Sequence, residues 1–174
     1  MKPRRRRRAL PLATLVERAQ CVADEVRAEL HSVHADVHER WHTRLHHDDD
    51  VDVWLISWTT EQGTQLHGHG GSSGAFTVVA GELAEAVWDP VARELGEQER
   101  RTGDAVAFGP GYVHDVRNVR AGTAVSVHVY SPPLERMDFF DVDGPRGEEH
   151  LVRLAHVWTD DPEIAYPGEL RDAS

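Results

Sequence analysis

The chain has 174 residues, of which 40% are hydrophobic and 28% charged, and its net charge at pH 7 is −11. This length and composition favour one globular domain, and no run of 18 apolar residues is present to form a membrane-spanning helix. An acidic protein repels phosphate backbones, so the charge argues against nucleic acid as a partner.

Basic residues gather at the start of the chain, at Lys2 and Arg4–Arg8. Such a run is typical of a nucleic-acid or membrane tether, but it is equally typical of an inconsequential extension, so we expect residues 1–10 to be disordered. Glu17 interrupts the apolar stretch too early for a secretory signal. Cys21 is the only cysteine, which excludes a disulfide framework. We therefore expect a cytoplasmic protein, and a monomer.

Residues 11–40 are predicted to be helical, because apolar residues recur there every three or four positions. With the residues up to 47 they form the helical N-terminal segment that we expect before the main fold. His34, His38 and His42 have helical spacing within it. They could bind a metal weakly, although a solvated helix face explains them as well.

From Val53 the pattern changes to short segments rich in β-branched and aromatic residues, namely VWLISW, AFTVVAG, ELAEAVW, DAVAFG and VSVHVY. Glycine and proline separate them at intervals of roughly ten residues, which is typical of an antiparallel sandwich or barrel. The sequence therefore predicts a mainly β fold, a small β-barrel or jelly roll, with residues 11–174 as one domain. The polar tail from Asp160 is expected to be loosely held.

Three histidines are candidates for a metal site. His67 and His69 are two positions apart, so in a strand their side chains share one face and could grip a metal together. A pair of hydrogen-bonded barrel histidines is the structural alternative. His114 follows the turn Gly109, Pro110, Gly111 and could supply a third ligand.

The glycines around these histidines resemble the two motifs of the cupin superfamily. Gly63 precedes the HxH pair and Gly74 and Gly81 follow it, while Gly103, the Gly-Pro-Gly turn, His114 and Asn118 match the second motif. Many cupins have glutamate where this chain has Gly74. Without this glutamate, the metal would have three neutral imidazole ligands and open positions. Such a site suits a substrate with its own anionic donor, such as a thiolate. The small residues Gly70–Gly74 are expected to clear space beside the metal.

Ser126, His128 and Tyr130 alternate on one predicted strand and are followed by SPP. This stretch closely resembles thiol dioxygenases, above all the type I cysteine dioxygenase family. The resemblance implies a catalytic serine–histidine–tyrosine row next to Fe(II) and a cis Ser131–Pro132 bond. Mammalian members carry a cysteine at the position of Gly74 that crosslinks to the tyrosine, so here we expect no crosslink and a free Tyr130 phenol.

The resemblance also extends upstream, where an arginine precedes the first core strand. Arg44 is the candidate for binding the substrate carboxylate, with Tyr130 beside it, and Arg40 is the alternative. In the related 3-mercaptopropionate dioxygenases this position is typically glutamine, so arginine favours cysteine.

The implied activity is conversion of L-cysteine and O2 to cysteine sulfinic acid by a non-haem Fe(II) enzyme. The alternatives are the same chemistry on 3-mercaptopropionate or another small thiol, a non-catalytic metal-binding or sugar-binding cupin, and a different cupin enzyme such as an isomerase. A non-catalytic cupin has no need of the Ser126–His128–Tyr130 row, and the other cupin enzymes usually retain the glutamate that Gly74 replaces.

Overall fold

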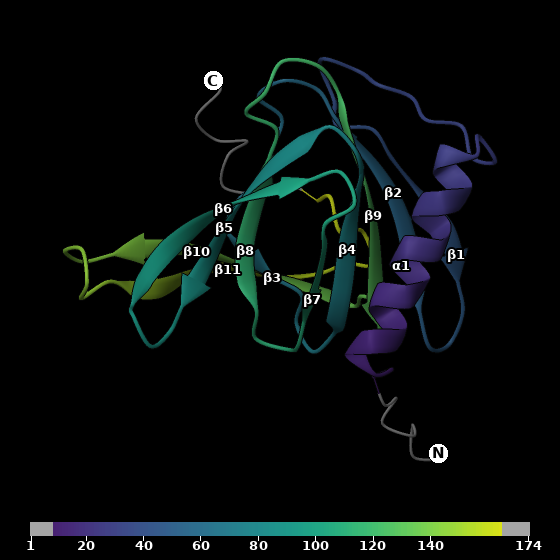
Figure 1. The fold of residues 1–174 in the computed structure, drawn as a ribbon. Helices are drawn as coiled ribbons and strands as arrows, with labels where there is room; N and C mark the ends of the chain where they lie inside the picture. Colours follow the sequence, from purple (N-terminus) through teal and green to yellow (C-terminus); the bar gives the residue numbers. More distant parts are fainter. Residues whose placement is uncertain (1–8, 165–174) are drawn as a thin grey trace, which may run out of the picture.

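The computed structural model describes residues 9–164, which form one helix, α1 (Leu12–Arg27), and two antiparallel sheets (Figure 1). The five-stranded sheet contains, in spatial order, β1 (His42–His47), β2 (Asp52–Trp58), β9 (Ala124–Ser131), β4 (Ser73–Ala80) and β7 (Ala105–Phe108). The six-stranded sheet contains β11 (His150–Trp158), β10 (Arg136–Asp143), β3 (His67–Gly68), β8 (Val113–Arg117), β5 (Glu82–Asp89) and β6 (Glu94–Arg101). The expectation of a mainly β fold is confirmed.

The predicted helical segment is too long. Helix α1 ends at Arg27, Glu29 adopts a left-handed conformation (φ 60°), and His42–His47 form strand β1 rather than a helix. Leu30, the last apolar residue of the periodic pattern, is 70% exposed and does not pack against the sheet. The segment after α1 instead crosses the end of β2, where Ser57 Oγ donates to the His34 carbonyl.

His34, His38 and His42 consequently do not share a helix face. The His34 ring packs edge-on against Trp41, while His42 lies in β1. Within residues 9–164 they form no metal-binding group. The weak metal site that their spacing suggested is therefore absent from the described part of the chain.

Strand alternation divides the five-stranded sheet into two faces. Val53 and Leu55 of β2 pack with α1 in one apolar cluster, and Figure 1 shows α1 lying along the outside of this sheet. Trp54, Ile56 and Trp58 point the other way, into a second cluster between the two sheets. Both faces of β2 and β9 are buried, so the continuous apolar runs of these strands are explained.

The structure describes each chain end only in part. Residues 1–8 of the predicted basic extension, and residues 165–174 of the tail, lie outside the described residues. Leu10, the last residue of the predicted extension, donates its backbone N–H to Ser131 Oγ, and so is attached to the domain.

The Ser131–Pro132 bond is cis, as the resemblance implied. None of the helices among the described residues is long and apolar enough to cross a bilayer.

Replacing Leu15 with alanine should lower the free energy of unfolding by about 3 kcal/mol, because Leu15 is fully buried between α1 and the sheet. Urea denaturation measures this change. Gln20→Ala, on the exposed side of the same helix, is the matched control and should alter the stability by less than about 0.5 kcal/mol. Equal effects of the two substitutions would contradict the packing of α1 on the barrel.

Candidate metal centre

Three buried histidines meet on the inner face of the six-stranded sheet. His67 in β3 is directly opposite His114 in β8, and His69 follows β3 by one residue. One ring nitrogen from each lies within 4.8 Å of the others, and His67 Nε2 and His69 Nε2 are 3.2 Å apart. The structure thus brings together all three histidines that the sequence selected as metal ligands.

The protonation of the cluster suits metal binding. Burial lowers the pKa of His67 and His69 well below the usual value, and repulsion from the other titratable groups nearby, mainly histidines, opposes protonation further. Both imidazoles are therefore neutral near pH 7, the form in which histidine binds metals. His67 Nδ1 lies 2.7 Å from the Gln65 carbonyl, which fixes Nε2 as the nitrogen free to face a metal.

A buried carboxylate that sequence analysis missed orients the third histidine. Glu85 in β5 is fully buried and accepts hydrogen bonds from His114 Nδ1 (2.7 Å), Arg100 Nε (2.7 Å) and Tyr112 Oη (2.9 Å). Burial alone would raise the pKa of Glu85, but the bonds from His114 and Arg100 outweigh it and hold the pKa below its usual value. Its signal in the sequence was a glutamate two positions after Leu83, in phase with an inward-facing apolar residue.

Gly74 does not leave open space beside the histidines, contrary to our expectation. A Cβ atom there would lie 2.4 Å from Phe108 Cζ. The Phe108 ring occupies that space and stacks on His69 with a centroid distance of 5.0 Å and an interplanar angle of 24°. The missing side chain at Gly74 therefore admits an aromatic wall for the metal site. The free Cys21 is exposed on α1, away from this site.

The predicted row on β9 lies next to the three histidines. The Tyr130 ring is 5.0 Å from that of His69, and the Tyr130 hydroxyl is 3.5 Å from His128 Nδ1. His128 Nε2 is 2.9 Å from Ser126 Oγ, which also accepts a hydrogen bond from the indole of Trp58 (2.8 Å). Trp58 therefore extends this row by a residue whose role could not be separated from core packing in the sequence.

Burial sets the charge of this row. It lowers the pKa of His128 to about 3 and raises the pKa of Tyr130 well above its usual value, with the negative charges of Glu163, Asp52 and Asp161 adding to the second effect. His128 is therefore a neutral imidazole and Tyr130 a protonated phenol at neutral pH. A protonated phenol can donate a hydrogen bond into the site.

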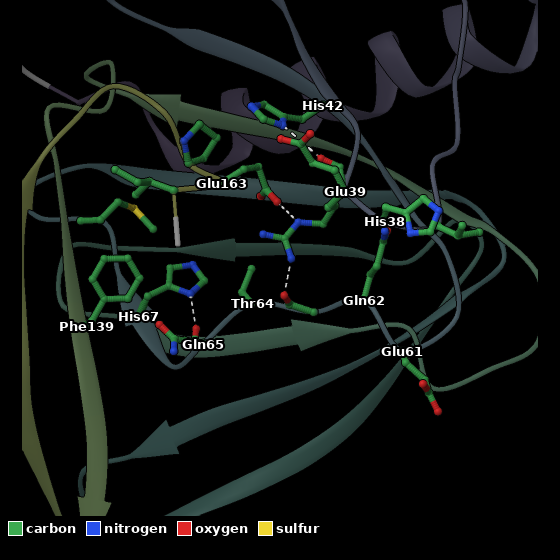
Figure 2. Close-up of a pocket in the computed structure, with 16 residues that line it drawn as sticks. His38, Glu39, His42, Glu61, Gln62, Thr64, Gln65, His67, Phe139 and Glu163 are labelled. Carbon is green, nitrogen blue, oxygen red and sulfur yellow. Dashed lines mark hydrogen bonds and ion pairs between the residues drawn. The ribbon is translucent and has the colours of Figure 1, made fainter. Parts of the chain in front are cut away.

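A cavity of about 510 Å³ opens beside His67 (Figure 2). Arg40 is one of the residues that line it. The Arg40 guanidinium lies over the Trp58 ring at 4.9 Å and donates to the Gly63 carbonyl. Arg44 is not among the lining residues. It lies over the Trp54 ring at 4.5 Å and donates to Asp160 at 2.9 Å. The alternative arginine, Arg40, therefore lines the cavity, whereas Arg44 lies on β1 and does not line it.

The C-terminal segment supplies a carboxylate to the same cavity. Glu163 forms an ion pair with Arg40, and its side chain is only 4% exposed. Figure 2 shows Glu163 and His67 facing the same cavity from different parts of the chain. Residues 160–164 are therefore bound to the domain, unlike the loosely held tail that their polar composition predicted.

Comparison with known proteins identifies the family. A sequence model described as cysteine dioxygenase type I matches residues 11–143, and the chain belongs to this family. Membership indicates a metal-dependent dioxygenase that takes a small molecule and O2.

Several solved structures are similar to part of this chain. TT1209 from Thermus thermophilus is 21% identical with a TM-score of 0.51, and the match covers 57% of this chain and 90% of that one. A Klebsiella pneumoniae protein with a double-stranded β-helix domain is 21% identical with a TM-score of 0.49, covering 57% and 83%. A cupin superfamily protein from Desulfitobacterium hafniense is 11% identical with a TM-score of 0.49, also covering 57% and 83%. The expected mainly β fold is confirmed by the two antiparallel sheets of this chain, with helix α1 as its N-terminal helical segment.

The residues fit a divalent transition metal. Three buried imidazoles converge. His67 Nδ1 faces the Gln65 carbonyl, His114 Nδ1 faces Glu85, and His69 Nδ1 is buried without a hydrogen-bond partner among the described residues. No carboxylate oxygen joins this group in the described part of the chain. The site would hold a metal through three nitrogen ligands.

Glu85→Ala should weaken metal binding about 10- to 100-fold, because His114 loses the carboxylate that holds its ring and polarises its outer nitrogen. Competition with a chromophoric chelator measures the affinity. Glu97→Gln, an exposed position on the neighbouring strand β6, is the control and should leave the affinity unchanged. Unaltered metal affinity in Glu85→Ala would rule out this role.

The metal-free protein should lose stability when the pH falls from about 7.5 to about 5.5. His67, His69 and His128 have folded pKa values below 6.5, so their contribution is complete above 6.5 and declines as the unfolded chain takes up protons. Each contributes at most about 1.4 kcal/mol per pH unit. His42, whose pKa is raised by Asp161, opposes this trend.

Urea denaturation at the two pH values tests this expectation. His128→Gln should reduce the slope of stability against pH by roughly the contribution of one proton. A wild-type protein that becomes more stable on acidification over this range would contradict the buried, neutral state of the three rings.

Proposed function

We propose that this protein is an Fe(II)-dependent thiol dioxygenase that converts L-cysteine and O2 to cysteine sulfinic acid. The observation that carries the proposal is the cluster of three buried histidines without a carboxylate ligand, next to a buried tyrosine and an arginine-lined cavity. Three imidazoles leave the full charge of the metal available to a thiolate. Membership of the cysteine dioxygenase type I family supports the same reaction.

The reaction balances without a further reductant. Both atoms of O2 form bonds to the substrate sulfur, which is oxidised from thiol to sulfinate while O2 is reduced. Bound Fe(II) supplies the one-electron chemistry that lets dioxygen react with a thiolate. The protein holds the thiol in place and excludes water from it.

Arg40 is our candidate for binding the substrate carboxylate, in preference to Arg44. Arg40 lines the cavity beside His67, and its guanidinium is positioned by Trp58 and the Gly63 carbonyl. A planar guanidinium binds a carboxylate through two parallel hydrogen bonds. Arg44 remains the alternative, because it is only four residues away along the same segment.

Tyr130 is the proposed hydrogen-bond donor to the substrate. Its phenol stays protonated because burial raises its pKa. If the Ser126 hydroxyl donates to His128 Nε2, the proton of His128 lies on Nδ1 and points at the Tyr130 oxygen. The Tyr130 proton is then free to point toward the substrate carboxylate or the reacting oxygen.

The proposal is tested by loading the protein anaerobically with Fe(II), adding L-cysteine and air, and measuring cysteine sulfinate together with oxygen uptake. We expect equal amounts of product and consumed O2, and none in His114→Ala. Arg40→Gln should raise the KM for L-cysteine at least about tenfold, and Arg44→Gln should raise it much less.

Three outcomes would change the account. A larger effect of Arg44→Gln would restore Arg44 as the carboxylate ligand. Turnover of 3-mercaptopropionate but not of L-cysteine would keep the chemistry and replace the substrate. Iron-loaded protein that oxidises no thiol would favour a non-catalytic metal-binding cupin.

A further inference from the structure

The Arg40 guanidinium, which the proposed function assigns to the substrate carboxylate, is already paired with a carboxylate of this chain. Glu163 approaches Arg40 Nε, while Arg40 Nη1 donates to the Gly63 carbonyl. The side chains of Arg40 and Glu163 are 14% and 4% exposed. The pair is therefore part of the cavity wall and is largely withdrawn from solvent.

Glu163 lies on the substrate side of the site. It lines the cavity together with His67, and its negative charge contributes to the raised pKa of Tyr130. Its carboxylate therefore pairs with the arginine and is near enough to the tyrosine for its charge to act on the phenol, and both residues are expected to receive the substrate. The burial of Glu163 raises the pKa of its own carboxyl group, and the charge of Arg40 opposes that rise.

The segment that carries Glu163 is attached at several points. Asp160 pairs with Arg44 at 2.9 Å, Asp161 approaches His42 at 3.2 Å, and Ile164 packs against the cluster of Leu134, Met137 and Phe139. These contacts are polar and partly exposed, apart from Ile164. Asp160 and Asp161 have side chains that are 66% and 43% exposed. Exposed ion pairs of this kind each contribute little to stability. Glu163 can therefore move away from Arg40 without unfolding the barrel.

We propose that Glu163 sets the substrate selectivity of this site by competing with the substrate's carboxylate for Arg40. This inference rests on the proposed function, since it assigns the preference among thiols. A second carboxylate cannot share one guanidinium with Glu163 without like-charge repulsion in a poorly solvated cavity. A thiol with a carboxylate must displace Glu163, whereas a thiol that has only an amine meets no such penalty. Glu163 also lies beyond residues 11–143, which the family model matches.

Steady-state kinetics of the Fe(II)-loaded enzyme with three thiols tests the proposal. L-cysteine and 3-mercaptopropionate carry a carboxylate, and cysteamine does not. Glu163→Gln should lower the KM for the first two about tenfold and leave the KM for cysteamine within about twofold. Glu163→Ala should act in the same direction. Asp160→Asn removes the same charge from the same segment and should change each KM by less than about twofold.

A binding measurement separates this inference from the proposed function. Protein loaded with redox-inert Zn(II) is titrated with 3-mercaptopropionate and with cysteamine in a calorimeter. Tighter binding of 3-mercaptopropionate alone in Glu163→Gln supports the competition, even if no thiol is ever oxidised. Weaker binding of 3-mercaptopropionate in this variant, equal tightening for both thiols, no change, or a larger effect of Asp160→Asn would each overturn it.

Discussion

The dehydration of three imidazoles inside a β-barrel is the constraint on which the rest of the site depends. A buried charged histidine is costly, so His67, His69 and His128 are neutral, and His67 and His69 are ready to give a lone pair to a metal. Side chains must therefore surround these imidazoles and exclude water from them. Phe108 is one of these side chains, and it reaches His69 only because Gly74 has no side chain.

Polar residues buried in the same barrel are hydrogen-bonded to one another. Glu85 is fully buried, and it is tolerated because His114, Arg100 and Tyr112 all donate to it. Ser126 is likewise buried and joins Trp58 to His128. In both cases a polar group on one strand fixes the ring of a functional histidine. The same buried hydrogen bonds therefore stabilise the core and orient the histidines of the site.

Sequence reasoning recovered what depends on short-range patterns. Strand alternation placed His67 with His69, and Ser126 with His128 and Tyr130, on shared faces. It did not recover features that depend on contacts distant in sequence. Glu85 on β5 meets His114 on the neighbouring strand β8, 29 positions along the chain, and Glu163 reaches Arg40 over 123 positions. The helix that was expected to continue beyond Arg27 failed for a related reason. An apolar periodic pattern stabilises a helix only where a surface packs against it, and Leu30, at the end of the pattern, is exposed to solvent.

Arginine placement shows the limit most clearly. Arg40 and Arg44 both precede the first inner strand, and each lies over a tryptophan of β2. Only the position of the cavity distinguishes the two arginines as candidates for substrate binding, because Arg40 lines the cavity and Arg44 does not. The extent of the cavity depends on the C-terminal segment, whose composition carried no sign of this role. Selectivity in this protein is thus attributed to a residue beyond the part of the chain that resembles its family.

The central claim is that three histidines bind a metal at which a substrate thiol can be held. X-ray absorption spectroscopy of the anaerobic Fe(II)-loaded protein, before and after addition of L-cysteine, tests it most directly. The account predicts nitrogen and oxygen neighbours with imidazole scattering before the addition, and a new iron–sulfur distance after it. His114→Ala removes one of the three imidazoles and should therefore reduce the imidazole scattering together with the sulfur signal. Bound iron without imidazole ligands, or without sulfur in the presence of cysteine, would contradict the account.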